Sequence, residues 1–86
     1  MKLISLPNIG KILEGRLVEA GVDSVEKLIA LGSKTAFMKM VEIDSEVCIS
    51  VIYSLEGAIQ GIRWHDLDRR KREELKKFYF AWRDPE

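Results

Sequence analysis

The chain has 86 residues, which suits one domain with a thin core, because a domain of this size buries only about 60–65% of the surface that its unfolded form exposes. It is 47% hydrophobic and 33% charged, a composition typical of a globular domain and not of a disordered tail. Fourteen Lys and Arg balance fourteen Asp and Glu. This zero net charge argues against a protein whose main task is to coat nucleic acid, although it leaves room for a local basic patch.

Cys48 is the only cysteine, which excludes an intramolecular disulfide and argues against a structural zinc site. A chain without disulfides fits a reducing compartment. The segment 1–7 has too short an apolar run for a signal peptide, and no stretch approaches the roughly 20 apolar residues that cross a bilayer. We therefore expect a single domain over residues 1–86 in the cytoplasm, with no membrane contact, no metal and no cofactor.

Helical spacing of apolar residues runs through the chain, and strand-type alternation never persists. The first expected helix begins after Pro7, with Asn8 as its N-cap and Gly21 as a left-handed residue at its end. Its apolar stripe consists of Ile9, Ile12, Leu13, Leu17 and Ala20.

Two shorter helices are expected next. Asp23 or Ser24 can cap the second helix, which ends at Gly32, and Asp23 with Glu26 would form a capping box. Ser33 can cap the third helix. The apolar positions of these two helices are Val25, Leu28, Ile29, Phe37, Met40 and Val41.

The fourth expected helix carries a continuous apolar stripe of about four turns, which marks it as the central helix. Asp44 is its expected N-cap. Gly57 and Gly61 lie one turn apart, and because glycine inside a helix costs about 1 kcal/mol relative to alanine, we expect a close helix–helix approach there. The stripe consists of Val47, Cys48, Val51, Ile52, Leu55, Ala58, Ile59 and Ile62.

The fifth expected helix has Asp68 as its N-cap. Its apolar residues occupy positions i, i+3, i+4 and i+7, namely Leu75, Phe78, Tyr79 and Trp82. Five short helices joined by short turns indicate an all-α, compact orthogonal bundle.

Four fragments stand in order along the chain: Leu-Pro-Asn-Ile-Gly at 6–10, Ala-Gly-Val-x-Ser-x-Glu-x-Leu at 20–28, Leu-Glu-Gly-Ala-Ile-x-Gly at 55–61 and Trp-x-x-Leu at 64–67. Together they resemble the C-terminal domain of the TfoX (Sxy) competence regulators. The resemblance implies a fold related to helix-hairpin-helix and SAM-like modules. It also implies a link to transcriptional control of DNA-uptake genes, together with the cAMP receptor protein. Members of the family carry a separate N-terminal domain, and with only five residues before the first fragment we expect a stand-alone domain.

The turn at 6–10 is one candidate for contact with an anionic partner such as duplex DNA. It resembles the Leu-Pro-Gly-Ile-Gly hairpin of helix-hairpin-helix DNA binders, in which backbone amides at a helix N-terminus meet a phosphate. The candidate residues are Asn8, Gly10 and Lys11. The alternative interpretation is architectural, with Pro7 setting the entry angle and Asn8 capping the helix.

The run Arg69-Arg70-Lys71-Arg72 is the second candidate for an anionic partner. Arg69, Arg70 and Arg72 have the charge density of a nucleic-acid patch. The alternative is a solvent-exposed face of paired charges, because oppositely charged residues follow one another at i,i+4 spacing. The expected pairs are Arg69–Glu73, Arg70–Glu74 and Glu73–Lys77.

Surplus apolar residues indicate a protein contact. Phe80 points away from the stripe of the last helix, and Ile49 and Tyr53 lie one turn apart beside the main stripe of the fourth. Exposed aromatic residues often mark a protein–protein interface. The alternative is that a small bundle wraps its central helix on most sides. We expect a docking surface or a homodimer contact at Ile49, Tyr53, Phe80 and Trp82.

Little in the sequence supports catalysis. His65 is the sole histidine and is expected in a turn or interface. Cys48 lies on the apolar stripe, so we expect it to be buried, and no histidine is spaced to activate it. We therefore predict a non-catalytic interaction module with no small-molecule substrate, linked to competence regulation. The alternative is a weak, sequence-nonspecific duplex-DNA binder.

Overall fold

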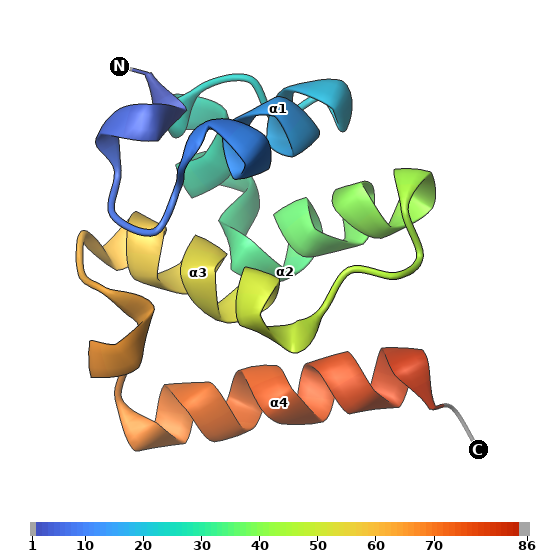
Figure 1. Cartoon of the computed structure of the whole chain (residues 1–86). Helices are drawn as coiled ribbons and strands as arrows, with labels where there is room; N and C mark the ends of the chain where they lie inside the picture. The colour runs from blue at the N-terminus through green and yellow to red at the C-terminus, as the bar shows by residue number, and fades with distance from the viewer. Residues whose placement is uncertain (1, 85–86) are drawn as a thin grey trace.

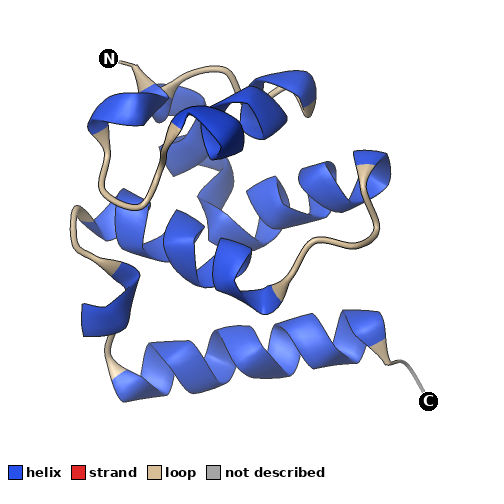
Figure 2. Ribbon diagram, in the orientation of Figure 1, coloured by secondary structure: helices blue, strands red, loops and turns tan. Residues whose placement is uncertain are grey.

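The computed structural model describes residues 2–84, which form four α-helices and two short 3₁₀ turns and contain no strand (Figures 1 and 2). The α-helices are α1 (Lys11–Glu19), α2 (Val25–Ile43), α3 (Ile49–Gln60) and α4 (Arg69–Arg83), and the turns are η1 (Leu3–Ser5) and η2 (Trp64–Asp66). The predicted all-α bundle is confirmed.

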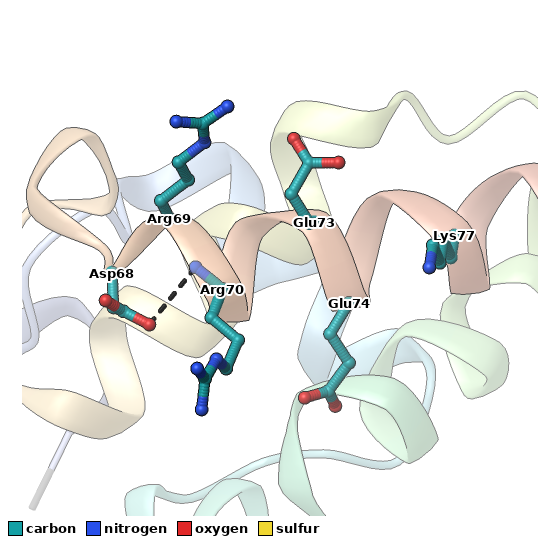
Figure 3. A pocket seen from close by; sticks show the side chains of 6 residues that line it. All are labelled: Asp68, Arg69, Arg70, Glu73, Glu74 and Lys77. Carbon is teal, nitrogen blue, oxygen red and sulfur yellow. Dashed lines mark hydrogen bonds between the residues drawn. The ribbon is translucent and has the colours of Figure 1, made fainter.

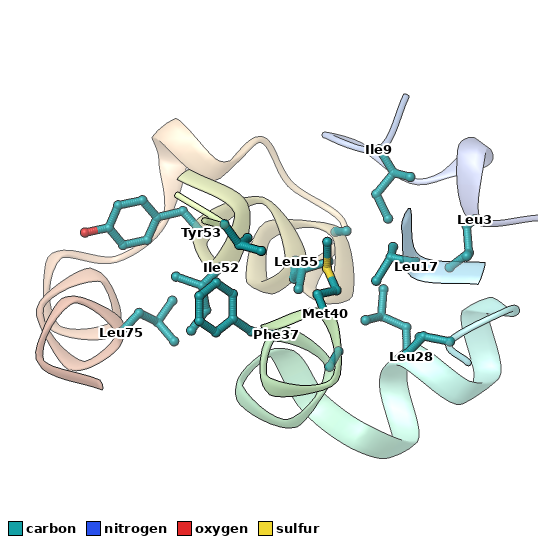
Figure 4. Close-up of a cluster of buried hydrophobic side chains, with 14 of the residues drawn as sticks. Leu3, Ile9, Leu17, Leu28, Phe37, Met40, Ile52, Tyr53, Leu55 and Leu75 are labelled. Atoms are coloured by element: carbon teal, nitrogen blue, oxygen red, sulfur yellow. The ribbon is translucent and has the colours of Figure 1, made fainter. Parts of the chain in front are cut away.

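Figure 1 shows three levels in the molecule. The turn η1, helix α1 and the first part of α2 lie above, the rest of α2 and α3 form the middle, and α4 runs below them as a separate rod. The core is continuous through all three levels (Figure 4). Phe37 of α2 and Ile52 of α3 meet Leu75 of α4 on one side, whereas Leu17 of α1 packs near Leu28 on the other.

The start of α1 differs from the prediction, while its end agrees. Gly10 occupies the N-cap, and no side chain accepts a hydrogen bond from the first turn. Gly21 is left-handed with φ +88°, as expected. The chain closes there because the N–H of Val22 donates to the carbonyl of Leu17 at 2.8 Å, the bond that typically seals a helix end at a left-handed glycine.

The second and third expected helices are one element, α2, with a break at Gly32, where φ is +82° and ψ is +164°. Ser24 is the N-cap and accepts from the N–H of Lys27 at 3.1 Å. The other expected cap is wrong: Ser33 is buried, and its hydroxyl donates to Oε1 of Glu56 in α3 at 2.7 Å. This bond ties the second half of α2 to the central helix.

The N-cap of helix α3 is Cys48, four residues after Asp44, the expected cap. Asp44 is instead the C-cap of α2, and its Oδ1 accepts from the N–H of Glu46 at 2.9 Å. Val47 enters the core, and because the next residue in extended backbone faces the other way, Cys48 is exposed at the N-cap of α3. The burial expected for Cys48 is therefore wrong. The Ser50 hydroxyl 3.0 Å from its sulfur lowers the pKa of this thiol.

Helix α4 follows the predicted pattern. The Asp68 side chain accepts from the N–H groups of Arg70 and Lys71, at 3.1 and 3.4 Å, and so caps the helix. Leu75 and Tyr79 are buried, and Phe78 and Trp82 pack beside them half-buried. This arrangement leaves the charged first turns of α4 on the outside of the molecule, where the candidate surfaces lie.

Candidate interaction surfaces

Asn8 does not cap α1; it joins the amino-terminal turn to the far end of α3. Its backbone is left-handed, with φ +71°. The side-chain amide donates to the carbonyl of Ile62 at 2.9 Å and to that of Ser54 at 3.3 Å, and its oxygen accepts from the N–H of Trp64 at 3.1 Å. We call this set of bonds the Asn8 tie. Because the amide is used inside the protein, Asn8 is not free to bind a phosphate.

The Asn8 tie can pack closely against α3 because Gly57 has no side chain. A Cβ atom on Gly57 would lie 2.5 Å from Nδ2 of Asn8 and 2.9 Å from the carbonyl oxygen of Ile62. The expected close approach is thus made by the Asn8 turn and not by another helix. Gly61, the other glycine of the pair, ends α3 in a left-handed conformation with φ +75°.

The start of α1 forms an apolar groove that sequence reasoning missed. Gly10 and Lys11 are exposed there, and Ile12 has 82% of its surface exposed, although it was expected in the buried stripe. The groove encloses about 450 Å³ and is lined by Gly10, Lys11, Ile12, Leu13, Arg16 and Val51. We call it the Ile12 groove. Its other wall, Val51, comes from α3.

Helical geometry explains why Ile12 faces solvent. Successive residues of an α-helix are about 100° apart, so Leu13, Leu17 and Ala20 fall within one arc of about 60°. Ile12 lies about 80° outside that arc. The apolar residues of α1 therefore span too wide an arc for one buried face, and this excess was visible in the sequence.

The outer face of α4 carries the expected basic run, but not the expected pairs. Figure 3 shows Arg69 and Glu73 pointing to one side of the helix and Arg70 and Glu74 to the other. Within residues 2–84 none of the three predicted i,i+4 ion pairs forms. The side chains surround an open hollow of about 800 Å³, lined by Asp68, Arg69, Arg70, Glu73, Glu74 and Lys77.

Glu74 forms ion pairs with two lysines and not with Arg70, its predicted partner. Its carboxylate contacts the ammonium of Lys34 on α2 at 2.5 Å and that of Lys71 at 3.3 Å. The hydrogen bond from Lys34, followed by that from Lys71, lowers the pKa of Glu74. Arg70 is consequently left without an ion pair in the described part of the chain, and so is Arg69.

Arg72 behaves differently from its neighbours because it packs on aromatic rings. Its guanidinium carbon lies 5.6 Å from the ring centroids of both Tyr53 and Trp64. These two rings stack on each other with centroids 5.5 Å apart and an interplanar angle of 16°. Tyr53 is only 9% exposed, so it is a core residue and not the exposed interface residue that was expected.

The other expected interface residues are divided between core and surface. Ile49 is half-buried against the core, and Trp82 packs edge-on against Phe37 with centroids 5.7 Å apart. Phe80 is 43% exposed and rests edge-on against Tyr79. Of the four, Phe80 is the only one with an exposed side chain.

His65 and the acidic side chains form no metal-binding group within the described residues. His65 is exposed and stacks on Trp64 with centroids 4.0 Å apart. Across residues 2–84 no group of three or more His, Cys, Asp or Glu side chains is arranged to hold a metal ion. Nor does this part of the chain contain a helix of the length and apolar character needed to span a membrane.

Comparison with known proteins places these features in a family. Residues 1–79 match the TfoX C-terminal domain. Protein Sxy of Escherichia coli (strain K12) is 35% identical over 77 residues, which cover 90% of this chain but only 37% of that protein. A crystal structure of an uncharacterized Listeria monocytogenes protein, in a triclinic form, is 51% identical with a TM-score of 0.96, covering 98% of this chain and 96% of the other.

A tetragonal crystal form of a Listeria monocytogenes protein of unknown function agrees with this result. It is 54% identical and has a TM-score of 0.89, over 91% of this chain and 96% of the other. The sequence match and the shared helical fold indicate the same family. The fragments that carry the resemblance agree with it, at 6–10, 20–28, 55–61 and 64–67. The chain belongs to the TfoX C-terminal domain family.

Proposed function

We propose that this chain is a non-catalytic interaction module that acts in the cytoplasm in the transcriptional control of DNA-uptake genes. Family membership supports the link to competence. The chain spans about 37% of the length of Protein Sxy, so what the whole of that relative does enters here as part of the proposal.

The observation that carries the interaction role is the Ile12 groove. Ile12 exposes 82% of its surface beside Leu13 and Val51, so the surface of the groove is mostly apolar. Burying an aliphatic side chain of this size contributes about 1.5–3 kcal/mol, which is enough to anchor a contact. A protein partner is the natural occupant, either a second copy of the chain or a heterologous protein.

Capture from a native cell extract, with the tagged full chain as bait, tests this role. Ile12→Glu should abolish the specific partner bands, whereas Ile29→Glu should retain them. Ile29 is a matched control because it is also an exposed isoleucine, at 54%, on a different helix. Light scattering near 100 μM separates the homodimer from a heterologous complex. Identical capture by wild type, Ile12→Glu and Ile29→Glu would exclude the groove as the site of contact.

A weak duplex-DNA binder is the second candidate, supported by the cations on the outer face of α4. Arg69, Arg70 and Lys77 surround an open hollow, and none of them has an ion pair within residues 2–84. Binding driven by phosphates should weaken steeply between about 50 and 200 mM salt, and the double substitution of Arg69 and Arg70 by Gln should reduce it further. An unchanged anisotropy of labelled duplex DNA at low salt would eliminate this candidate.

A further inference from the structure

A second groove lies between η2, α3 and α4, on a different side of α4 from the outward-pointing Arg70. It encloses about 430 Å³ and is lined by Tyr53, Leu67, Arg69, Arg72, Glu73 and Lys76. We call it the α3–α4 groove. Leu67 and Tyr53 are buried at its base, and most of the surface that it exposes is polar.

The charges in the α3–α4 groove favour a negatively charged occupant. Three cations, Arg69, Arg72 and Lys76, face one carboxylate, Glu73. Arg72 is already held in place by its contacts with Tyr53 and Trp64, and no carboxylate pairs with it within residues 2–84. An arginine that is fixed before binding loses less side-chain entropy when it meets an anion.

Phe80 extends the same side of α4 with an apolar contact. It follows Lys76 by four residues and Arg72 by eight, so the three lie along one face of the helix. Phe80 is 43% exposed. Arg69 and Phe80 are 11 residues apart, which spans about 16 Å of helix, or the length of about five extended residues.

We propose that the α3–α4 groove binds an acidic protein segment, with carboxylates on Arg69, Arg72 and Lys76 and an apolar side chain on Phe80. One feature favours a protein segment over nucleic acid. Phe80 gives an apolar anchor at the end of the cationic row, where a duplex backbone offers only phosphate and sugar. This surface is additional to the Ile12 groove.

Trp64 gives a direct readout of this groove, because it stacks on Tyr53 beneath Arg72. The chain has two tryptophans, so Trp82→Phe leaves Trp64 as the sole one. The probe is a 12-residue peptide of Asp and Glu with interspersed Leu and Phe, titrated while the Trp64 emission is followed. We expect saturable binding. Arg72→Gln and Phe80→Ser, each in this background, should weaken it about tenfold.

Two controls separate this proposal from the others. Lys77→Gln removes a cation from the outer hollow and should leave the peptide affinity unchanged. Ile12→Glu should also leave it unchanged, so failure of the interaction role at the Ile12 groove and failure here give different results. Equal affinity for the same peptide with Asn and Gln in place of its acids would overturn the proposal. An unchanged Trp64 emission up to about 1 mM peptide would also overturn the proposal. So would a 20-base-pair DNA duplex that binds more tightly than the peptide and whose affinity Phe80→Ser leaves unchanged.

Discussion

The conformation of Asn8 depends on residues far from it in the sequence. The fragment at 6–10 correctly predicted a turn before the first helix, but asparagine favours both N-caps and left-handed backbone. Which of the two it adopts here is decided by its bonds to Ser54, Ile62 and Trp64, which lie 46, 54 and 56 residues away. The sequence pattern of a single helix therefore does not predict which of the two conformations Asn8 adopts.

Asn8→Ala should lower the free energy of unfolding by about 3 kcal/mol, since it removes three hydrogen bonds worth about 1 kcal/mol each. Asn8→Gly removes the same bonds but tolerates φ +71°, so we expect it to cost about 1 kcal/mol less than alanine. Urea unfolding followed by circular dichroism measures both values. Equal losses for the two variants would mean that the left-handed backbone contributes nothing.

Gly57→Ala should destabilise the protein by about 2–3 kcal/mol, because the added Cβ meets the Asn8 tie and must displace it. Gly15→Ala is the matched control, since Gly15 is inside α1 and a Cβ there has nothing within 4 Å. Alanine is the better helix former, so this variant should be more stable by up to about 1 kcal/mol. Thermal melts that shift in the same direction for both variants would contradict the packing argument.

At the scale of elements, two of the glycines that end or break a helix were predictable, and the starts of α1 and α3 were not. Gly21 and Gly32 have positive φ, and each ends or breaks a helix where its sequence position suggested. Gly61 was expected inside the fourth helix, but it also has positive φ and ends α3. The start of α3 was misplaced because Asp44 has the chemistry of an N-cap but lies at the end of α2. At the end of α2 the backbone N–H of Asp44 donates to the carbonyl of Met40, while its Oδ1 accepts from the N–H of Glu46 as an N-cap oxygen would. Its side-chain chemistry alone therefore does not place the helix start.

Glu74 connects α4 to α2, and its lowered pKa predicts a pH dependence of stability. A carboxyl whose pKa is lower in the folded state stabilises the protein above its unfolded pKa, near 4.3, and this contribution is lost as the pH falls through the folded value. The difference in unfolding free energy between wild type and Glu74→Gln should therefore shrink from pH 7 to pH 3. Glu73→Gln, which removes no ion pair within residues 2–84, should show a smaller change; equal pH profiles would refute this assignment.

For the molecule as a whole, the helical fold was predictable, whereas the proposed interaction surfaces were predictable only in part. The exposed Phe80 and the basic run of α4 were expected, and the Ile12 groove was not. Apolar periodicity indicates which face of each helix is apolar. An interaction surface depends instead on which helix faces stay uncovered after the helices pack together. Tyr53 and Trp82 proved to be covered by Trp64 and Phe37, while Ile12 was left open. The contacts that decide these outcomes link different helices, so they cannot be derived one helix at a time.

Phe37 is the residue through which α4 is attached to the rest of the protein. It is fully buried and contacts both Tyr79 and Trp82. Phe37→Ala should cost about 3–5 kcal/mol, a large share of the roughly 5–10 kcal/mol expected for a domain of this size. Phe80→Ala on the exposed side should cost less than about 1 kcal/mol. Calorimetry compares the two, and similar losses would mean that the aromatic cluster does not hold α4 in place.

The Asn8 tie also has a consequence for the time course of folding. Its partners are 46 to 56 residues away along the chain, so it closes a long loop, whereas each helix forms from near neighbours. Bonds of such long range are expected to form after the rate-limiting step. Losing them should therefore accelerate unfolding and leave the refolding rate nearly unchanged. The small amino-terminal turn would then determine how long the folded domain survives and not how quickly it assembles.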